Sequence, residues 1–302
     1  MRTMTEIIKF TKGQSIRTAV ACAGDKEVLE AILSAASEEL VEPILYGDEK
    51  KIRTILDELE TDAESFTIVS CTSDEEACKA ACRDVSEGRA SILMKGFVDT
   101  KVILKAVLNE GLVEDGGLLS HVMTFEFRDR SKLLMVSDGG VVMYPGLFEK
   151  SVMIRNAKVL ADALGISPFK VACLSAVEKV NPKLQSTLDG KALKEMSGKA
   201  GFEGIIIEGP ISFDLAVSRD AAEIKGYESP VAGDADMLLV PDMEAGNILA
   251  KSLTYMAGGD SAGLVLGAKV PIVLVSRADS SRVKLNSIAL AVLVAKKGES
   301  IE

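Results

Sequence analysis

A short loop near the end of the chain combines residue types that bind anions. The segment V-S-R-A-D-S (275–280) follows an apolar run at 271–275 and precedes a helical pattern. A guanidinium holds an oxyanion through two parallel hydrogen bonds, and a helix N-terminus favours negative charge. Ser276 and Arg277 are therefore candidate ligands of phosphate or an acyl phosphate. The alternative is a plain helix cap whose arginine pairs with a neighbouring acid.

Other polar segments follow predicted strands in the same way. Short β-branched runs alternate with helical patterns, which predicts an α/β fold with mostly parallel sheets. Ligands of such sheets collect at the carboxyl ends of the strands. Three further segments lie at predicted strand ends: S-D-G-G (137–140), E-G-P-I-S (208–212) and V-P-D-M-E-A-G-N (240–247). Asp138, Asp242, Gly246 and Asn247 become candidate substrate contacts, with a plain N-cap as the alternative for Asp242.

The elements between these segments are predicted from periodicity and capping signals. Strands are expected at 17–25, 42–48, 91–96, 132–140, 170–176, 204–212, 235–242 and 271–277. A long helix is expected over 148–164, ending before Gly165, and Thr100 is expected to cap the helix after the strand at 91–96.

Several familiar motifs are absent or lack their structural context. Neither G-x-G-x-x-G nor G-x-x-x-x-G-K-[ST] occurs, so no nucleotide fingerprint is present. G-D-S-A-G (259–263) matches a nucleophile elbow, but a predicted helix precedes it and a strand follows, the reverse of the order that the elbow requires. The single histidine, His121, precedes that serine, and a structural role within a strand is favoured for it over a catalytic one. Ser120 beside it is a candidate substrate donor.

Composition narrows the function classes. The 302 residues include 35 Lys and Arg, 45 Asp and Glu, and one histidine, for a net charge of -10. This balance opposes nucleic-acid binding, and one histidine cannot build a multi-histidine metal site. The five cysteines form no C-x-x-C pair, and no apolar run approaches the ~18 residues of a membrane span. We expect a cytoplasmic protein with reduced thiols, no metal, and no membrane or nucleic-acid partner.

A long stretch of the chain resembles a known family. The segment at 229–280 resembles the phosphate acetyl/butyryl transferases, and within that family its sequence is most similar to the butyryl branch. It includes P-D-M-E-A-G-N-I-L-A-K-S-L-T-Y-M-A-G-G and V-S-R-A-D-S. The segments K-L-L-M-V-S-D-G-G and K-L-N-S-I-A-L-A (284–291) fit as well. The resemblance implies the reaction acyl-CoA plus phosphate giving acyl phosphate plus CoA, by direct displacement in a ternary complex without metal or redox cofactor. It also implies a homodimer or higher homo-oligomer.

The resemblance assigns roles to individual residues. Arg277 matches the family's anion-binding arginine, and Ser276 matches a serine that would hydrogen-bond the carbonyl oxygen or phosphate. The acetyl branch carries an aspartate six residues after the arginine, where this chain has Val283, so the general base is open. Asp279 is the nearest carboxylate. Lys95 is a further candidate for contact with phosphate or CoA, whereas solvation is favoured for Arg282 and Lys284.

The implied fold has two α/β domains, like isocitrate and isopropylmalate dehydrogenases, with the active site in the cleft between them. We expect residues 1–140 and 266–302 in the first domain and 141–265 in the second. The alternative within the family is a phosphate acetyltransferase that uses acetyl-CoA. The alternatives of another class are an NAD-dependent decarboxylating dehydrogenase on the same fold and a non-catalytic CoA- or phosphate-binding module. The preferred acyl chain stays open, because one methylene changes discrimination by only ~1–3 kcal/mol.

Overall fold

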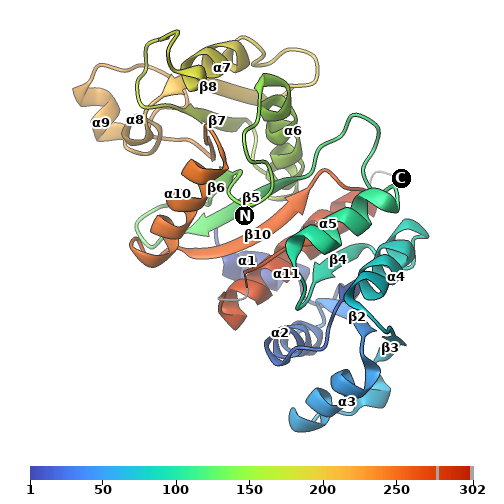
Figure 1. Ribbon diagram of the computed structural model, residues 1–302. Coiled ribbons are helices and arrows are strands. Elements are labelled where there is room, and N and C mark those ends of the chain that lie inside the picture. The colour runs from blue at the N-terminus through green and yellow to red at the C-terminus, as the bar shows by residue number, and fades with distance from the viewer. Residues whose placement is uncertain (277–278, 300–302) are drawn as a thin grey trace. The chain divides into compact units, whose positions relative to one another are not determined.

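The computed structural model describes residues 1–276 and 279–299 (Figure 1). The chain forms two compact units. We call residues 4–117 and 262–302 the terminal unit, and residues 1–3 and 118–261 the central unit. The C-terminal segment from residue 262 onward belongs to the same unit as residues 4–117. The expected border at residue 140 falls after the first two strands of the central unit, whereas the units of the structure divide before them.

The terminal unit is built on a mostly parallel sheet. Its strands lie in the order β3-β2-β1-β4-β11-β10, and only the pairing of β10 with β11 is antiparallel. The strands are β1 (Ile16–Ala21), β2 (Val41–Gly47), β3 (Thr67–Ser70), β4 (Ile92–Lys95), β10 (Asp260–Leu266) and β11 (Ile272–Val273). The helices are α1 (Met4–Thr11), α2 (Lys26–Ser37), α3 (Glu49–Glu58), α4 (Asp74–Ser86), α5 (Thr100–Asn109) and α11 (Ser281–Glu299).

Helices cover both faces of this sheet. Helix α11 packs against both α1 and α2, and α4 packs against α5 (Figure 1). The central strands are consequently buried on both faces, which explains the short apolar runs at residues 19–21 of β1 and 92–94 of β4. Helix α2 begins at the N-cap Asp25, whose side chain accepts a hydrogen bond from the amide of Val28. Helix α5 has Asp99 at its N-cap, so the prediction of Thr100 as the cap is wrong.

In the central unit, the sheet has the strand order β5-β6-β9-β7-β8; it is mostly parallel, and of these strands only β5 runs antiparallel to its neighbour β6. Its strands are β5 (Ser120–Glu126), β6 (Leu134–Ser137), β7 (Phe169–Leu174), β8 (Ile205–Ile211) and β9 (Met237–Leu239). Its helices are α6 (Leu147–Ala163), α7 (Gln185–Lys194), α8 (Phe213–Val217), α9 (Arg219–Ile224) and α10 (Met243–Tyr255). The long helix expected over 148–164 is confirmed as α6.

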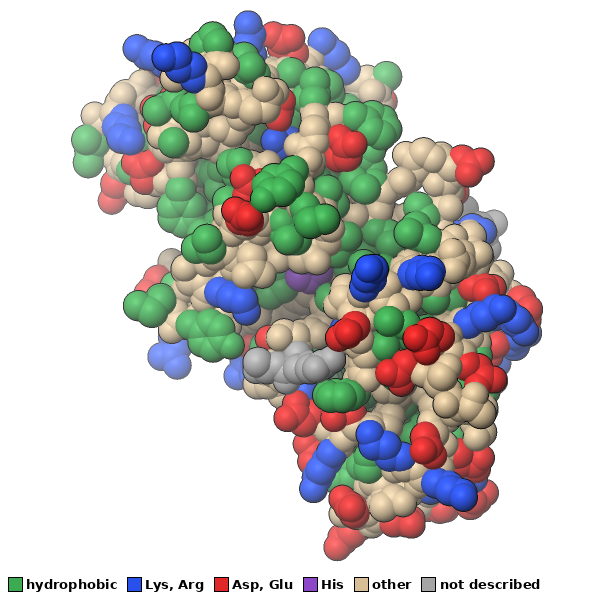
Figure 2. All heavy atoms as spheres, in the orientation of Figure 1, with side chains coloured by type: hydrophobic (Ala, Val, Ile, Leu, Met, Phe, Trp, Pro, Cys, Tyr) green, Lys and Arg blue, Asp and Glu red, His purple; other side chains and the backbone are tan. Residues whose placement is uncertain are grey.

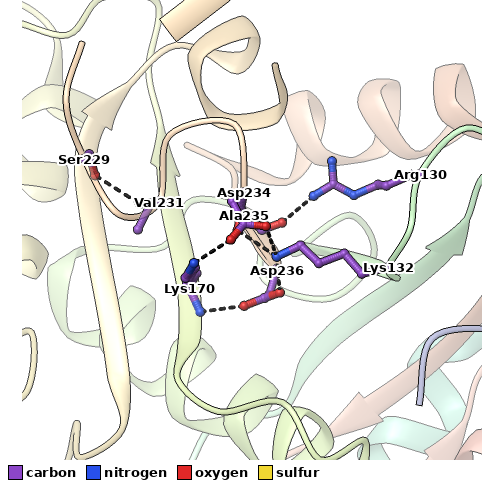
Figure 3. Close-up of polar contacts among 8 residues, drawn as sticks. All are labelled: Arg130, Lys132, Lys170, Ser229, Val231, Asp234, Ala235 and Asp236. Atoms are coloured by element: carbon purple, nitrogen blue, oxygen red, sulfur yellow. Dashed lines mark hydrogen bonds and ion pairs between the residues drawn. The ribbon is translucent and has the colours of Figure 1, made fainter. Parts of the chain in front are cut away.

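Buried charges fix the central strand of this sheet just before it begins (Figure 3). Asp236 precedes β9 and is 4% exposed. Its carboxylate accepts hydrogen bonds from Lys132 Nζ at 2.6 Å and from the backbone amide of Lys170 at 2.8 Å. Its backbone carbonyl accepts a hydrogen bond from the amide of Met135. Asp236 therefore joins β9 to the two strands that flank it, β6 and β7.

Asp234 extends the same network toward solvent. Burial raises the pKa of Asp234, but hydrogen bonds from Lys132 and Lys170 outweigh that effect and hold its pKa at about 2. A folded-state pKa below the ordinary value makes the carboxylate stabilising above pH 4. That contribution is lost as the pH falls toward 2.

None of the helices in the described part of the chain combines the length and the apolar character that crossing a bilayer requires.

The network predicts unequal roles for its two acids. We expect Asp236→Ala to lower the free energy of unfolding of the central unit by about 3 kcal/mol, because it removes a buried carboxylate that pairs with Lys132 and leaves the backbone amide of Lys170 without its acceptor. Asp234→Ala is the matched control, and its half-exposed pairs predict a loss of at most about 1 kcal/mol. Urea denaturation of both variants at neutral pH measures the difference, and equal losses would contradict it.

Candidate functional site

A pocket lies where three strands of the terminal unit end. Strands β1, β4 and β11 run parallel to one another, so their carboxyl ends lie at one edge of the sheet. The pocket there has a volume of about 100 Å³. Its wall consists of residues at the ends of these strands, in the loops that follow them and in the first turns of the next helices: Asp25, Glu27, Val28, Met94, Lys95, Gly96, Phe97, Val275, Ser276 and Lys284. The sequence-predicted residues Ser276 and Lys95 are thus brought together.

Gly96 brings the end of β4 directly against the end of β1. Its amide donates to the carbonyl of Ala21 at 2.8 Å, and the amide of Phe97 donates to the carbonyl of Cys22 at 2.9 Å. A Cβ at Gly96 would collide with both carbonyl oxygens. Only glycine therefore permits this approach, which positions Gly96 and Phe97 in the pocket wall.

Lys95 places a buried positive charge in this wall. The residue is 6% exposed, and its Nζ donates to the carbonyls of Gly96 at 3.2 Å and Val98 at 2.9 Å. These two acceptors are backbone carbonyls, which carry no net charge. Lys95 therefore places a cationic group at the end of β4.

Lys284 brings a second buried ammonium to the pocket from helix α11. It is 4% exposed, and its Nζ donates to Glu27 in the first turn of α2 at 2.8 Å. The hydrogen bond and the charge of Lys284 hold the pKa of Glu27 below its ordinary value. The expectation that Lys284 is a solvated surface residue is wrong.

The position of Lys284 has a signal in the sequence. Counting by three and four from Lys284 along α11 gives the buried residues Ile288, Ala291 and Ala295, so the lysine lies on the apolar face of the helix. Glu27 has no comparable signal, because first-turn acids are common at helix N-termini.

The loop before α11 presents Ser276 to the pocket. The carboxylate of Asp279 accepts a hydrogen bond from the amide of Ser276 at 2.7 Å, and the amide of Asp279 donates to the carbonyl of Ser276. Ser280 then caps α11, because its hydroxyl accepts from the amide of Val283. The predicted anion ligand Arg277 lies outside the described residues.

In the central unit, Asp138 organises the loop that follows β6. One carboxylate oxygen accepts from the amides of Gly140 at 2.7 Å and Val141 at 2.8 Å, and the other accepts from the amide of His121 at 2.6 Å. The side chain is 1% exposed. Both oxygens of this sequence-predicted contact hold backbone, so Asp138 acts on the shape of the loop.

The start of α10 packs against this same loop. Asp242 is the N-cap of α10, and its side chain accepts from the amide of Ala245. A Cβ at Gly246 would collide with the carbonyl oxygen of Asp138, so glycine is required there. Asn247 is exposed, and its Nδ2 donates to the carbonyl of Gly139 at 3.0 Å. The structure thus gathers Asp138, Asp242, Gly246 and Asn247 around one loop.

Ser120 and His121 begin β5 in the interior of the central unit. Ser120 is fully buried, and its hydroxyl accepts a hydrogen bond from Nδ2 of Asn156 at 2.9 Å. His121 lies within β5 as the sequence predicted, and its ring lies against Gly140. The G-D-S-A-G segment follows α10 and forms the start of β10, which confirms the helix-before-strand order that opposed a nucleophile elbow.

The overall charge of the chain does not attract anions. The chain carries a net charge of -10, and on the face shown in Figure 2 acidic and basic side chains of the terminal unit are interspersed. An anion must therefore be held by local groups. The two buried ammonium groups of Lys95 and Lys284 provide such a region.

Comparisons with known proteins agree with this chemistry. The family described as "Phosphate acetyl/butaryl transferase" matches residues 75–292. The chain belongs to this family. It is 40% identical to the phosphate butyryltransferase of Clostridium acetobutylicum over 297 residues, which cover 98% of this chain and 99% of that relative. It is 39% identical to the phosphate acetyltransferase of Thermotoga maritima, with 97% and 99% covered. The chain is therefore a phosphate acyltransferase of the butyryl or acetyl kind.

Solved structures bear out the predicted fold. A branched-chain phosphotransacylase from Enterococcus faecalis superposes with a TM-score of 0.81 at 31% identity, covering 93% of this chain and 99% of that one. A 4-hydroxythreonine-4-phosphate dehydrogenase from Burkholderia phymatum shares the fold at 13% identity, with a TM-score of 0.53 and 93% and 98% covered. The expected likeness to a dehydrogenase fold is thus confirmed.

The strand contact at Gly96 yields a stability prediction. We expect Gly96→Ala to cost about 1–3 kcal/mol of stability and to lower phosphate acyltransferase activity, because the new Cβ must separate the ends of β1 and β4. Gly24→Ala is the matched control in the neighbouring loop, since its Cβ would meet only the flexible side chain of Lys51 at 3.3 Å. Thermal unfolding and activity of both variants check the prediction, and a harmless Gly96→Ala would refute the close approach.

Proposed function

We propose that this enzyme transfers a short acyl chain, such as butyryl, from CoA to inorganic phosphate by direct displacement in a ternary complex. The observation that carries the proposal is the pocket at the ends of β1, β4 and β11, where Ser276 lies with two buried ammonium groups. Relatives named phosphate butyryltransferase and branched-chain phosphotransacylase support the choice of a short chain longer than acetyl.

The pocket suits a small anion. Its volume of about 100 Å³ is well below the ~300–1,000 Å³ of pockets that enclose a whole drug-sized ligand. It therefore takes the reacting groups and not the whole of CoA. Lys95 supplies fixed positive charge, Ser276 supplies a hydroxyl, and we assign to Arg277 the bidentate grip on phosphate that its match to the family implies.

The reaction follows from holding phosphate against the thioester. A phosphate oxygen attacks the carbonyl carbon, and negative charge develops on the carbonyl oxygen. We assign the hydroxyl of Ser276 to that oxygen, where a donor stabilises the transition state more than the ground state. The carbon–sulfur bond then breaks, and acyl phosphate and the CoA thiolate are released.

The remaining candidates have supporting roles in this proposal. Asp279 fixes the backbone of Ser276 through the hydrogen bond to its amide, which keeps the hydroxyl in one place. In the central unit we keep Asn247 as a candidate substrate contact, since it is exposed. Asp138, Asp242, Gly246 and Ser120 would act on substrate through the loop and strand that they hold.

Acyl-chain preference tests the proposal as a whole. We expect phosphate-dependent release of thiol from acyl-CoA, with kcat/KM for butyryl- or isobutyryl-CoA at least ~10-fold above that for acetyl-CoA, because each methylene in an apolar site adds binding energy. Acetyl-, propionyl-, butyryl-, isobutyryl- and longer acyl-CoAs are compared at saturating phosphate. Highest activity with acetyl-CoA would refute the assigned acyl-chain preference. Thiol release that does not depend on phosphate would refute the proposed reaction.

The role of Arg277 is tested separately. We expect Arg277→Ala to lower phosphate-dependent thiol release by about 100-fold or more, because the developing anion loses a charged donor. Arg277→Lys should restore it only in part, since an ammonium lacks the planar fork. Arg282→Ala is the control, an exposed arginine in the first turn of the next helix. Full activity in Arg277→Ala would remove this loop from the site.

A further inference from the structure

The pair formed by Lys284 and Glu27 is strongly asymmetric. The side chain of Lys284 is 5% exposed, whereas that of Glu27 is 63% exposed. Water screens the exposed carboxylate, so it neutralises the buried ammonium only in part. An ordinary structural ion pair in a core buries both partners, as Lys150 and Asp189 do in the central unit at 5% each.

The ammonium of Lys284 also has hydrogen-bonding capacity beyond this pair. An ammonium carries three N–H donors. Among the described residues, Glu27 is the acceptor that its Nζ meets. Because Lys284 lines the same pocket as Ser276, its further donors are available to a ligand there.

We propose that Lys284 binds the sulfur of CoA and stabilises it as a thiolate. This inference rests on the proposed phosphate acyltransfer and names the group that handles its sulfur. Lys284 would touch the reacting atom, and Glu27 would be a positioning residue that holds the ammonium at the pocket wall.

The step balances without an added reactant. In acyl phosphate formation, a phosphate oxygen bonds to the carbonyl carbon, the carbon–sulfur bond breaks, and its electron pair stays on sulfur as the thiolate beside Lys284. In the reverse direction, the bound thiol gives its proton to water. The thiolate then attacks the acyl phosphate, and phosphate leaves with the electron pair of the carbon–oxygen bond. A lysine beside sulfur lowers a thiol pKa, so the thiolate forms without a strong base.

The neighbouring charges favour sulfur over phosphate as the ligand of Lys284. Helix α2 presents Glu27 and Asp25 to this wall, β4 presents Lys95, and Asp279 lies in the loop before α11. Of the residues that the structure describes, β11 and α1 add no titratable side chain to the pocket. A phosphate with about two negative charges is repelled by the two acids of α2 more strongly than a thiolate with one.

The test is a pH titration of bound CoA. The ultraviolet absorbance of the thiolate is followed in the enzyme–CoA complex, and the complex with desulfo-CoA, which lacks the thiol, is subtracted to remove the protein's own cysteines. We expect the bound thiol to have an apparent pKa of ~7.5 or lower, against ~8.5 for a free thiol. This readout needs no turnover.

Variants locate the effect. We expect Lys284→Met to raise the bound thiol's apparent pKa by about one unit or more, and Lys284→Arg to keep most of the lowering because a cation remains. Methionine fills the same buried space, and Glu27 is exposed enough to be solvated alone, so the fold should persist. Lys26→Met is the matched control, since Lys26 is an exposed lysine on α2 outside the pocket wall.

The outcomes separate this inference from the proposed function. Phosphate-dependent thiol release by the wild type, together with an unchanged thiol pKa in Lys284→Met, would overturn the inference alone. A raised KM for phosphate in Lys284→Met with no change in the thiol titration would assign the lysine to phosphate and overturn it as well. If CoA does not bind, both fail. A lowered thiol pKa without turnover of any acyl-CoA would support the sulfur site and refute the proposed function.

Discussion

The pocket of the terminal unit depends on how closely β4 approaches β1 at their carboxyl ends. The absence of a side chain at Gly96 lets two successive amides reach carbonyls of the neighbouring strand, at 2.8 and 2.9 Å. That contact fixes the direction in which Lys95, one residue earlier, enters the wall. Strand β11 pairs with β4 on its other side and ends at the same edge of the sheet, so Ser276, which follows β11, lies there too. Strand spacing and one glycine thus determine which polar groups meet.

Charge within the pocket follows a simple physical logic. A buried ammonium is costly unless its donors are satisfied, and full neutralisation by a buried carboxylate would leave nothing for a substrate. Lys95 donates to two backbone carbonyls, and Lys284 is paired with a carboxylate that water screens. Both arrangements place a cationic group at the pocket of a chain whose net charge is -10. A net charge therefore says little about the ligands of a local site.

The sequence predicts which edge of the sheet carries the candidate site, but it does not predict every residue that lies there. Alternating strands and helices place Lys95 and Ser276 at strand ends, because parallel strands end on one side. Lys284 is missed when charged residues are read as solvated, although its helical position relative to Ile288 shows the buried face. Glu27 and the approach at Gly96 depend on packing between distant segments, which local patterns do not encode. Arg277 rests on the family resemblance, outside the described residues.

The carboxylates at the predicted strand ends share a use that bears on catalysis. Asp138 accepts hydrogen bonds from three backbone amides, Asp242 caps α10, and Asp279 accepts a hydrogen bond from the amide of Ser276. Each of these acids holds a loop in shape. The carboxylate oxygens that accept these amides are therefore occupied by the backbone. Under the proposed function, among the described residues, the hydroxyl of Ser276 and the two buried lysines of the pocket are the groups assigned to substrate, which favours catalysis by fixed positive charge.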